Sequence, residues 1–459
     1  MPDLKRIDRL GGVVSVLWQR FREVFRQSLL HNILSLYSVH FAYYLLPLIT
    51  VPYLARVLGA AGWGYVAFTQ GSAGAVTILV EYGFNFSATR EASLARHSRP
   101  ERAQLLASIL GAKALLAAIG VALVLLASPW IPIYREHPDL LAAGLAWAVA
   151  QGFSLSWYFA GLERMRAVAT MEVSARVVAA AGIFLLVRHP GDSWKVLAIQ
   201  AVAAGSAVTG GLIAAYREVE VRLPRWRAVF NGLRVGKSLF VFRGAESIYN
   251  AGSSFLLGLW APPQAVAWYA GAERLSKAVY GVLEPISRGL YPRLNYLVRH
   301  QQRDAYRTIR VAIVVMTAGG FLLGLGLFVS APLLIRIMLG PQFGPAVLAL
   351  RILSLLPLLV AIKTVIGFQW MLPFRLDSAF NKIIVGAGIV HLTFVMLVGR
   401  HYSHLGMAWA LVIAEGWVVL CSCGVVWARG LNPWKRWPEE ADAAIEIEPS
   451  AEVAVESSL

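Results

Sequence analysis

The chain has 459 residues, of which 58% are hydrophobic and only 15% are charged, whereas a soluble domain carries about 25% charged residues. This composition excludes an ordinary water-soluble protein. At about 20 apolar residues per membrane-spanning helix, the length accommodates about a dozen spans and no separate soluble domain of ordinary size. The net charge of +16 fits several kinds of partner, nucleic acid included, so its position along the chain decides its meaning.

Residues 1–31 precede the first long apolar stretch and are rich in arginine. Leu17, Phe21 and Phe25 recur there at helical spacing among these arginines. This pattern predicts an amphipathic helix that lies on the cytoplasmic membrane surface. No small-residue cleavage site follows a short apolar core, which argues against a removable signal peptide.

Twelve apolar stretches, separated by short connections, make up most of the remaining chain. They are 34–57, 63–84, 105–128, 140–160, 167–187, 194–215, 237–260, 264–286, 311–335, 345–371, 380–399 and 403–428. The sequence therefore predicts an all-α polytopic membrane protein with about twelve transmembrane helices.

The positive charges indicate how these helices are oriented. Both tails and every second connection together contain 28 lysines and arginines, whereas the intervening connections contain few. Cytoplasmic loops accumulate these residues, so both termini are predicted to be cytoplasmic. Tryptophans near the ends of the stretches, such as Trp63, Trp130 and Trp427, fit interface positions on either side. This distribution of basic residues and tryptophans is typical of a bacterial inner-membrane protein.

The two halves of the chain resemble each other at an offset of about 205 residues. VVAAAGI at 177–183 aligns with IIVGAGI at 383–389, and ALVLLASPWIPI at 122–133 aligns with GLFVSAPLLIRI at 326–337. Six spans per half give both halves the same orientation. We therefore expect two pseudo-symmetric six-helix lobes, 32–215 and 237–430, around a central cavity, joined by a cytoplasmic linker at 216–236.

Residues 431–459 differ in composition from the rest of the chain. From Glu439 onward they contain seven acidic residues and no lysine or arginine, which predicts a solvated, disordered tail. The body of the protein is accordingly more basic than its net charge suggests. Membrane topology and contact with anionic lipids explain most of this charge, and no nucleic-acid partner is expected.

Several segments resemble the O-antigen flippases, which are polysaccharide transporters of the multidrug/oligosaccharidyl-lipid/polysaccharide exporter superfamily. The segments are LPLITVPYLARVLGAAGWGYVAFTQ (46–70), VEYGFNFSATREASLAR (80–96), SIYNAGSSFLLGLW (247–260), VAWYAGAERL (266–275) and GLYPRLNYL (289–297). The resemblance implies a twelve-helix, two-lobed transporter. It further implies that undecaprenyl-pyrophosphate-linked oligosaccharide moves from the cytoplasmic to the periplasmic leaflet for surface polysaccharide synthesis.

Ionisable residues inside membrane spans cost about 2.5–3.5 kcal/mol each at the centre of a helix, which makes them functional candidates. Here the cations outnumber the acids by six to four. The cations are Lys113, Arg176, Arg243, Arg274, Lys277 and Lys363, and the acids are Glu172, Glu246, Glu273 and Glu415. This excess of cations predicts an interior that favours an anionic group.

The seventh and eighth spans each concentrate polar residues on one face. Arg243, Glu246 and Asn250 recur at i, i+3 and i+7 in the seventh span, which places them on one helix face. In the eighth span Glu273 and Lys277 share a face. The pattern predicts a water-filled cavity in the C-terminal lobe.

Such a cavity would suit a pyrophosphate, because arginine offers a bidentate donor and lysine a mobile point charge. We expect Arg243, Arg274 and Lys277 to bind it. In the alternative interpretation, Glu246 pairs with Arg243 and Glu273 with Lys277, and these pairs only neutralise charge and fix helix register.

The remaining ionisable residues inside predicted spans lie outside the seventh and eighth spans. Glu172 precedes Arg176 by one helical turn, which favours an internal pair near the cytoplasmic entrance. Lys113 and Lys363 have no partner on their own helices, so they are candidates for contact with substrate or for lining the cavity.

No nucleotide-binding loop is present in the sequence, so we expect a proton or sodium gradient, not a cofactor, to drive transport. Glu273 and Glu415 are the candidate coupling carboxylates, because a desolvated carboxyl group can load and release a proton. Glu415 is equally compatible with a hydrogen bond to a neighbouring helix.

Two other functions are less compatible with the sequence than that of a flippase. A multidrug or cation antiporter of the same superfamily would favour an acidic cavity, which the excess of deep cations disfavours. A polysaccharide polymerase or glycosyltransferase would need an exposed catalytic loop, and the external connections are too short for one. Polymerase or ligase proteins are instead possible partners, together with membrane lipids and the lipid-linked oligosaccharide itself.

Overall fold

A computed structural model describes residues 27–434 except 231, 234–239, 241–243 and 245–251. For residues 27–45, 47, 165, 166, 168 and 169 it describes the backbone alone. The predicted surface helix at 1–31 and the acidic tail at 431–459 lie almost entirely outside the described residues. The described residues form helices and short connections without a strand, which confirms the predicted all-α class.

The first half of the chain contributes one long helix and a set of shorter ones. They are α2 (Gln27–Glu81), α3 (Phe84–Leu94), α4 (Arg99–Ala127), η1 (Ser128–Trp130), α5 (Pro132–Glu136), α6 (Pro138–Gly152), α7 (Ser156–Gly161), α8 (Met165–Leu186), η2 (Pro190–Asp192) and α9 (Ser193–Tyr216).

The second half of the described chain also consists of helices and short connections. Its elements are α11 (Ser253–Gly258), α12 (Pro263–Tyr280), η3 (Gly281–Leu283), α13 (Glu284–His300), α14 (Gln302–Leu334), η4 (Ile335–Leu339), η5 (Pro341–Phe343), α15 (Ala346–Leu353), α16 (Leu356–Lys363), η6 (Thr364–Met371), α17 (Asp377–Phe394), η7 (Val395–Gly399) and α18 (Arg400–Ala428).

Eleven of the twelve predicted apolar stretches coincide with described helices, and 237–260 falls largely outside the described residues. Six helical stretches of the described chain are long and apolar enough to cross a membrane. The protein is therefore a multi-pass membrane protein. The exact number of crossings and the side of each terminus stay predictions.

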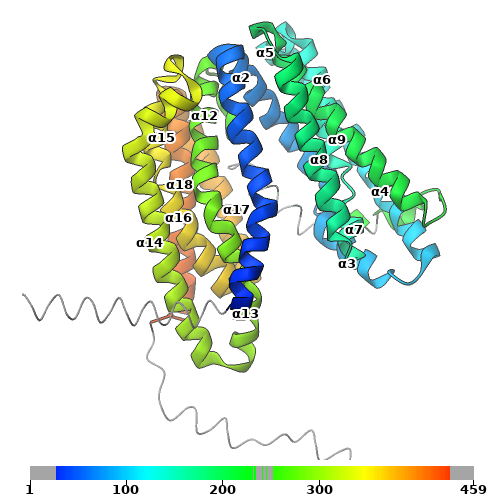
Figure 1. Ribbon diagram of the computed structural model, residues 1–459, viewed down its shortest axis with the longest axis vertical. Coiled ribbons are helices and arrows are strands. Elements are labelled where there is room, and N and C mark those ends of the chain that lie inside the picture. The colour runs from blue at the N-terminus through cyan, green and yellow to red at the C-terminus, as the bar shows by residue number, and fades with distance from the viewer. Residues whose placement is uncertain (1–26, 231, 234–239, 241–243, 245–251, 435–459) are drawn as a thin grey trace, which may run out of the picture.

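The helices form two bundles that approach each other at one end and lie apart at the other (Figure 1). Helices α3–α9 make the first bundle, and α11–α18 make the second. Among the described residues, every extensive contact between the bundles involves α2, which packs against α6, α8 and α9 on one side and against α12 and α13 on the other. Helix α2 thus connects the two halves.

A sharp bend allows α2 to serve both bundles. The bend lies at Gly59, whose φ of 69° and ψ of 179° are non-helical and suit a residue without a Cβ atom. Two further contacts hold this end together, since Gln342 Nε2 donates to the Ala55 carbonyl at 3.0 Å and the Arg56 guanidinium donates to the Ile337 carbonyl. Both contacts join the bend region of α2 to the second bundle.

The backbones of α2 and α12 lie very close together just after this bend. A Cβ atom on Gly64 would lie 1.8 Å from the carbonyl oxygen of Pro263, the first residue of α12. A side chain on Gly258 would likewise meet the Phe68 ring at 2.3 Å. We call the contact between the second half of α2 and α12 the inter-bundle seam.

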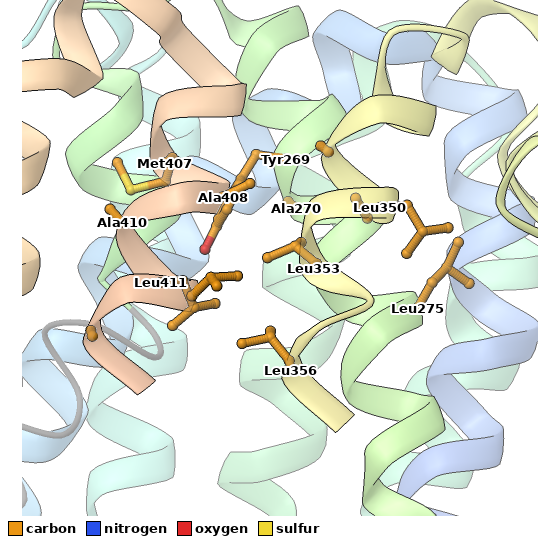
Figure 2. Close-up of a cluster of buried hydrophobic side chains, with 14 of the residues drawn as sticks. Tyr269, Ala270, Leu275, Leu350, Leu353, Leu356, Met407, Ala408, Ala410 and Leu411 are labelled. Atoms are coloured by element: carbon orange, nitrogen blue, oxygen red, sulfur yellow. The ribbon is translucent and has the colours of Figure 1, made fainter. Parts of the chain in front are cut away.

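The second bundle has a continuous apolar core beneath the seam. Figure 2 shows α12, α15, α16 and α18 contributing interlocking side chains to it, among them Leu275, Leu353, Leu356 and Leu411. Leu353 is fully buried, and Leu356 and Leu411 are almost fully buried. This core gives α12 a rigid support on the side away from α2.

We predict that Gly64→Ala destabilises the protein by about 1–3 kcal/mol, because the new methyl group forces α12 away from α2. Thermal unfolding of the purified protein in detergent measures the effect. Gly205→Ala is the matched control, since a Cβ atom there meets nothing within 4 Å. Equal unfolding temperatures for the two variants would contradict the close approach.

Candidate functional site

A large cavity lies against the first bundle. Its volume is about 630 Å³, and helices α2, α6, α7, α8 and α9 line it. The lining is mostly apolar, as is usual for small-molecule sites. Its charged and amide side chains are Glu81, Asn85, Gln151, Glu172, Arg176 and Gln200.

One end of this cavity can be assigned to a side of the membrane. Glu81 is the last residue of α2, and Asn85 lies at the start of α3. These residues lead into the connection 85–104, which the charge distribution predicts to be cytoplasmic. The cavity therefore reaches the predicted cytoplasmic end of the first bundle, where the two bundles lie apart (Figure 1).

Lys113 stabilises the wall of the cavity. Its ammonium group is buried and donates to the Gly152 carbonyl at 2.8 Å and to the Ser154 carbonyl at 2.9 Å. These carbonyls lie at the C-terminal end of α6, where the chain breaks before α7 and helical acceptors are left without backbone donors. A cation at a helix C-terminus is favourable, so Lys113 stabilises the break and does not itself line the cavity.

Arg274 belongs to the inter-bundle seam. Its guanidinium group lies over the Trp63 ring, 4.3 Å from the ring centroid, and donates to the side-chain oxygen of Gln70. Gln70 Nε2 in turn donates to Gln200 Oε1 at 3.0 Å, and Gln200 lines the cavity. A polar chain therefore runs from α12 through α2 to the cavity wall on α9.

The two predicted carboxylates of the second bundle both lie in ion pairs. Glu273 Oε1 contacts Lys277 Nζ at 2.9 Å along α12. Glu415 Oε1 on α18 accepts from Lys363 Nζ on α16 at 2.7 Å, and both side chains are buried. Its second oxygen, Oε2, has no hydrogen-bond donor among the described residues.

Arg243, Glu246 and Asn250 lie outside the described residues, so the predicted polar face of the seventh span stays a prediction. Of the other residues predicted to line a cavity in the second bundle, Glu273, Arg274 and Lys277 do not line the large cavity. The structure places the large cavity on the opposite bundle. Arg176 and Glu172, for which the sequence favoured an internal pair, both line this cavity and interact electrostatically with each other.

At the predicted cytoplasmic end of the first bundle, Glu218 joins two segments. Its carboxylate contacts Arg102 at 3.1 Å and also accepts from Arg164. Burial alone would raise the pKa of Glu218, but the hydrogen bonds from Arg164 and Arg102 outweigh it and lower the pKa. The carboxylate is therefore charged at neutral pH, and the contact weakens only as the pH falls through this lowered pKa.

Sequence reasoning missed Trp63, Gln70, Gln151 and Gln200 as site residues. The three glutamines are polar residues within predicted spans, which is the signal that could have identified them. A search for ionisable residues does not identify them, because glutamine carries no charge. Their role depends on which helices face each other, and the sequence does not specify that.

Two helical bundles that meet at one seam beside a cavity, in a chain with several helices of membrane-spanning length, are the architecture of a membrane transporter. The solved structures agree with this architecture. One titled "Lipid II flippase MurJ, inward closed conformation" has a TM-score of 0.68 at 12% identity, covering 85% of this chain and 87% of that chain. An inward-facing multidrug resistance MATE family transporter of the MOP superfamily has a TM-score of 0.62 at 11% identity, covering 84% and 98%.

Sequence comparison supplies the family. The chain belongs to the polysaccharide biosynthesis protein family, whose model matches residues 29–298. A protein of Escherichia coli (strain K12) named "Putative O-antigen transporter" is 27% identical over 397 residues, covering 84% of this chain and 94% of the relative. A protein of Shigella dysenteriae with the same name is 28% identical over 396 residues, covering 85% and 98%. These relatives are transporters, not enzymes, which confirms the predicted class.

We predict that Glu415→Gln destabilises the protein by about 3–5 kcal/mol, because it leaves the buried Lys363 ammonium group without its counter-charge. The double substitution Lys363→Met/Glu415→Leu should recover most of this loss, since it buries no charge. Thermal unfolding in detergent gives the comparison. Arg288→Gln, which breaks the exposed pair with Glu284, is the control and should cost about 0–1 kcal/mol. A double variant as unstable as the single one would show that the ion pair is not the cause.

Proposed function

We propose that this protein is a flippase of the bacterial inner membrane that moves an undecaprenyl-pyrophosphate-linked oligosaccharide from the cytoplasmic to the periplasmic leaflet. The product would serve O-antigen or other surface polysaccharide synthesis. Membership of the polysaccharide biosynthesis protein family and the names of the two bacterial relatives support this substrate class. Polymerase and ligase proteins would be its partners on the periplasmic side.

One observation carries the proposal: the cavity, with its charged and amide side chains, reaches the predicted cytoplasmic end, while the two bundles meet at the seam toward the opposite end. A site that is accessible from one side only is what alternating access requires of one conformation. The cavity volume of about 630 Å³ lies within the range of small-molecule sites. It suits a pyrophosphate and the first sugars, while a polyprenyl chain stays in the surrounding lipid.

Arg176 is the candidate for contact with pyrophosphate among the charged residues that line the cavity. Its planar guanidinium group can donate two parallel hydrogen bonds to phosphate oxygens. Lys113 and Lys363 instead make structural contacts, Lys113 with the Gly152 carbonyl and Lys363 with Glu415. Arg243, Arg274 and Lys277 remain proposed ligands for a conformation in which the seam has opened.

We further propose that a proton or sodium gradient drives the cycle. Glu415 is one candidate coupling carboxylate, because its oxygen Oε2 is buried and has no hydrogen-bond donor among the described residues. Glu273 is the second candidate, since the side chain of its partner Lys277 is one-third exposed and water can therefore reach the ion pair.

The alternative function is a multidrug or cation antiporter of the same superfamily. A specific observation favours it: the charged residues described in the cavity lining include two carboxylates, Glu81 and Glu172, beside Arg176. The MATE-like fold does not separate the two functions. Deletion of the gene in the native bacterium distinguishes the two functions. Loss of surface glycan supports the flippase, whereas changed susceptibility to cationic drugs supports the antiporter.

We predict that Arg176→Ala lowers the rate of leaflet transfer about tenfold or more, because a bidentate phosphate contact is lost. The measurement is transfer of a defined lipid-linked oligosaccharide in proteoliposomes, with and without proton and sodium gradients. Arg176→Lys should keep part of the rate, since lysine retains the charge but not the planar donor.

Arg188→Ala is the matched control for this series, because Arg188 is exposed beyond the end of α8 and should transfer at the unaltered rate. Full transfer by Arg176→Ala would remove Arg176 from the binding site. Absence of transfer with every oligosaccharide tried would argue against the flippase itself and favour the antiporter.

A further inference from the structure

The predicted cytoplasmic end of the second bundle carries a basic helical hairpin. It consists of α13 and the first turns of α14, residues 284–310, which contain six arginines and two acids, Glu284 and Asp304. Glu284 already contacts Arg288 at 2.5 Å. Arg299, Arg303 and Arg307 are all exposed at the tip of the hairpin, so the tip is a cationic surface that faces away from the apolar core.

The chain leaves the described structure beside this hairpin. Trp370 Nε1 donates to the Leu431 carbonyl at 2.8 Å and thereby fixes the segment that follows α18. The Trp370 ring packs edge-on against Tyr306 of α14, with 4.9 Å between ring centroids. Gln369 Nε2 also donates to Ser287 Oγ of α13 at 2.9 Å. The exit point therefore lies at the root of the hairpin.

The sequence beyond this point complements the hairpin in charge. Residues 439–456 contain seven acids and no lysine or arginine. Glu439 follows the last described residue, Trp434, by only five positions, so it stays within about 18 Å of it even when fully extended. The short tether gives the acids a high effective concentration at the hairpin, in the millimolar range for short flexible linkers.

We propose that residues 439–456 dock on the exposed arginines of the α13–α14 hairpin. The tail then acts as an intramolecular counter-charge that competes with anionic lipid headgroups for the same arginines. The exit point of the chain beside the hairpin favours the hairpin over the connection 217–227, which belongs to the first bundle. This docking does not depend on which molecule the protein transports.

Photo-cross-linking of the full-length protein tests the proposal. A photoreactive amino acid replaces Ile447, which lies between two of the tail acids, and the cross-linked peptides are identified by mass spectrometry in phosphatidylcholine vesicles. We expect cross-links to residues 284–310. The triple variant Arg299→Gln/Arg303→Gln/Arg307→Gln should lower their yield about fivefold, as the loss of three exposed charge pairs implies.

The matched control is Arg222→Gln/Arg225→Gln/Arg227→Gln, which removes three arginines from the connection of the first bundle and should leave the yield unchanged. Reversed charges on both sides, Glu446→Lys/Glu448→Lys/Glu452→Lys with Arg299→Glu/Arg303→Glu/Arg307→Glu, should restore it. This rescue separates a lost contact from a misfolded hairpin.

Three results would overturn the proposal. The first is a yield that neither the hairpin variant nor high salt reduces. The second is cross-linking mainly to residues 1–26 or 217–227. The third is a cross-linking yield that stays the same in phosphatidylglycerol vesicles, which would contradict competition between the tail and anionic lipid for these arginines.

Discussion

The arrangement of the protein depends on one close backbone contact, where Gly64 of α2 meets Pro263 at the start of α12. Because α2 makes all the extensive contacts between the described parts of the two bundles, a movement of one bundle relative to the other rearranges the contacts of this helix. The bend at Gly59 lets the two halves of α2 pack against different helices. A glycine at each position is therefore required by geometry, and the polar chain from Arg274 through Gln70 to Gln200 connects the same seam to the cavity wall.

A charged side chain inside the membrane must form an ion pair or hydrogen bond, or line a water-filled cavity. Lys113 binds helix-terminal carbonyls, Lys363 binds Glu415, and Arg274 binds Gln70 and the Trp63 ring. These contacts explain why the cost of inserting the cations is tolerated. They also leave the charged residues on the cavity wall as the ones that a substrate can reach directly in this conformation.

Much of the fold could be predicted from the sequence, because apolar stretches of span length and alternating basic connections are strong one-dimensional signals. The all-helical class and the family follow from them and from the segments around 46–70. The site could be predicted only in part. Pairs within one helix, such as Glu273 with Lys277, follow from spacing. The contact between Lys363 and Glu415, and the position of the cavity on the first bundle, depend on which helices face each other, and that is set by packing in three dimensions.

Distances between spin labels at the two ends of the bundles test alternating access around the seam most directly. Labels at Glu136→Cys and Gly344→Cys report the seam end, and labels at His97→Cys and Gln301→Cys report the opposite end, in a Cys421→Ser/Cys423→Ser background. Addition of a lipid-linked oligosaccharide and an ion gradient should lengthen the first distance and shorten the second in a common subpopulation. Two distances that stay unchanged under conditions of active transfer would contradict a rocking motion of the bundles about α2.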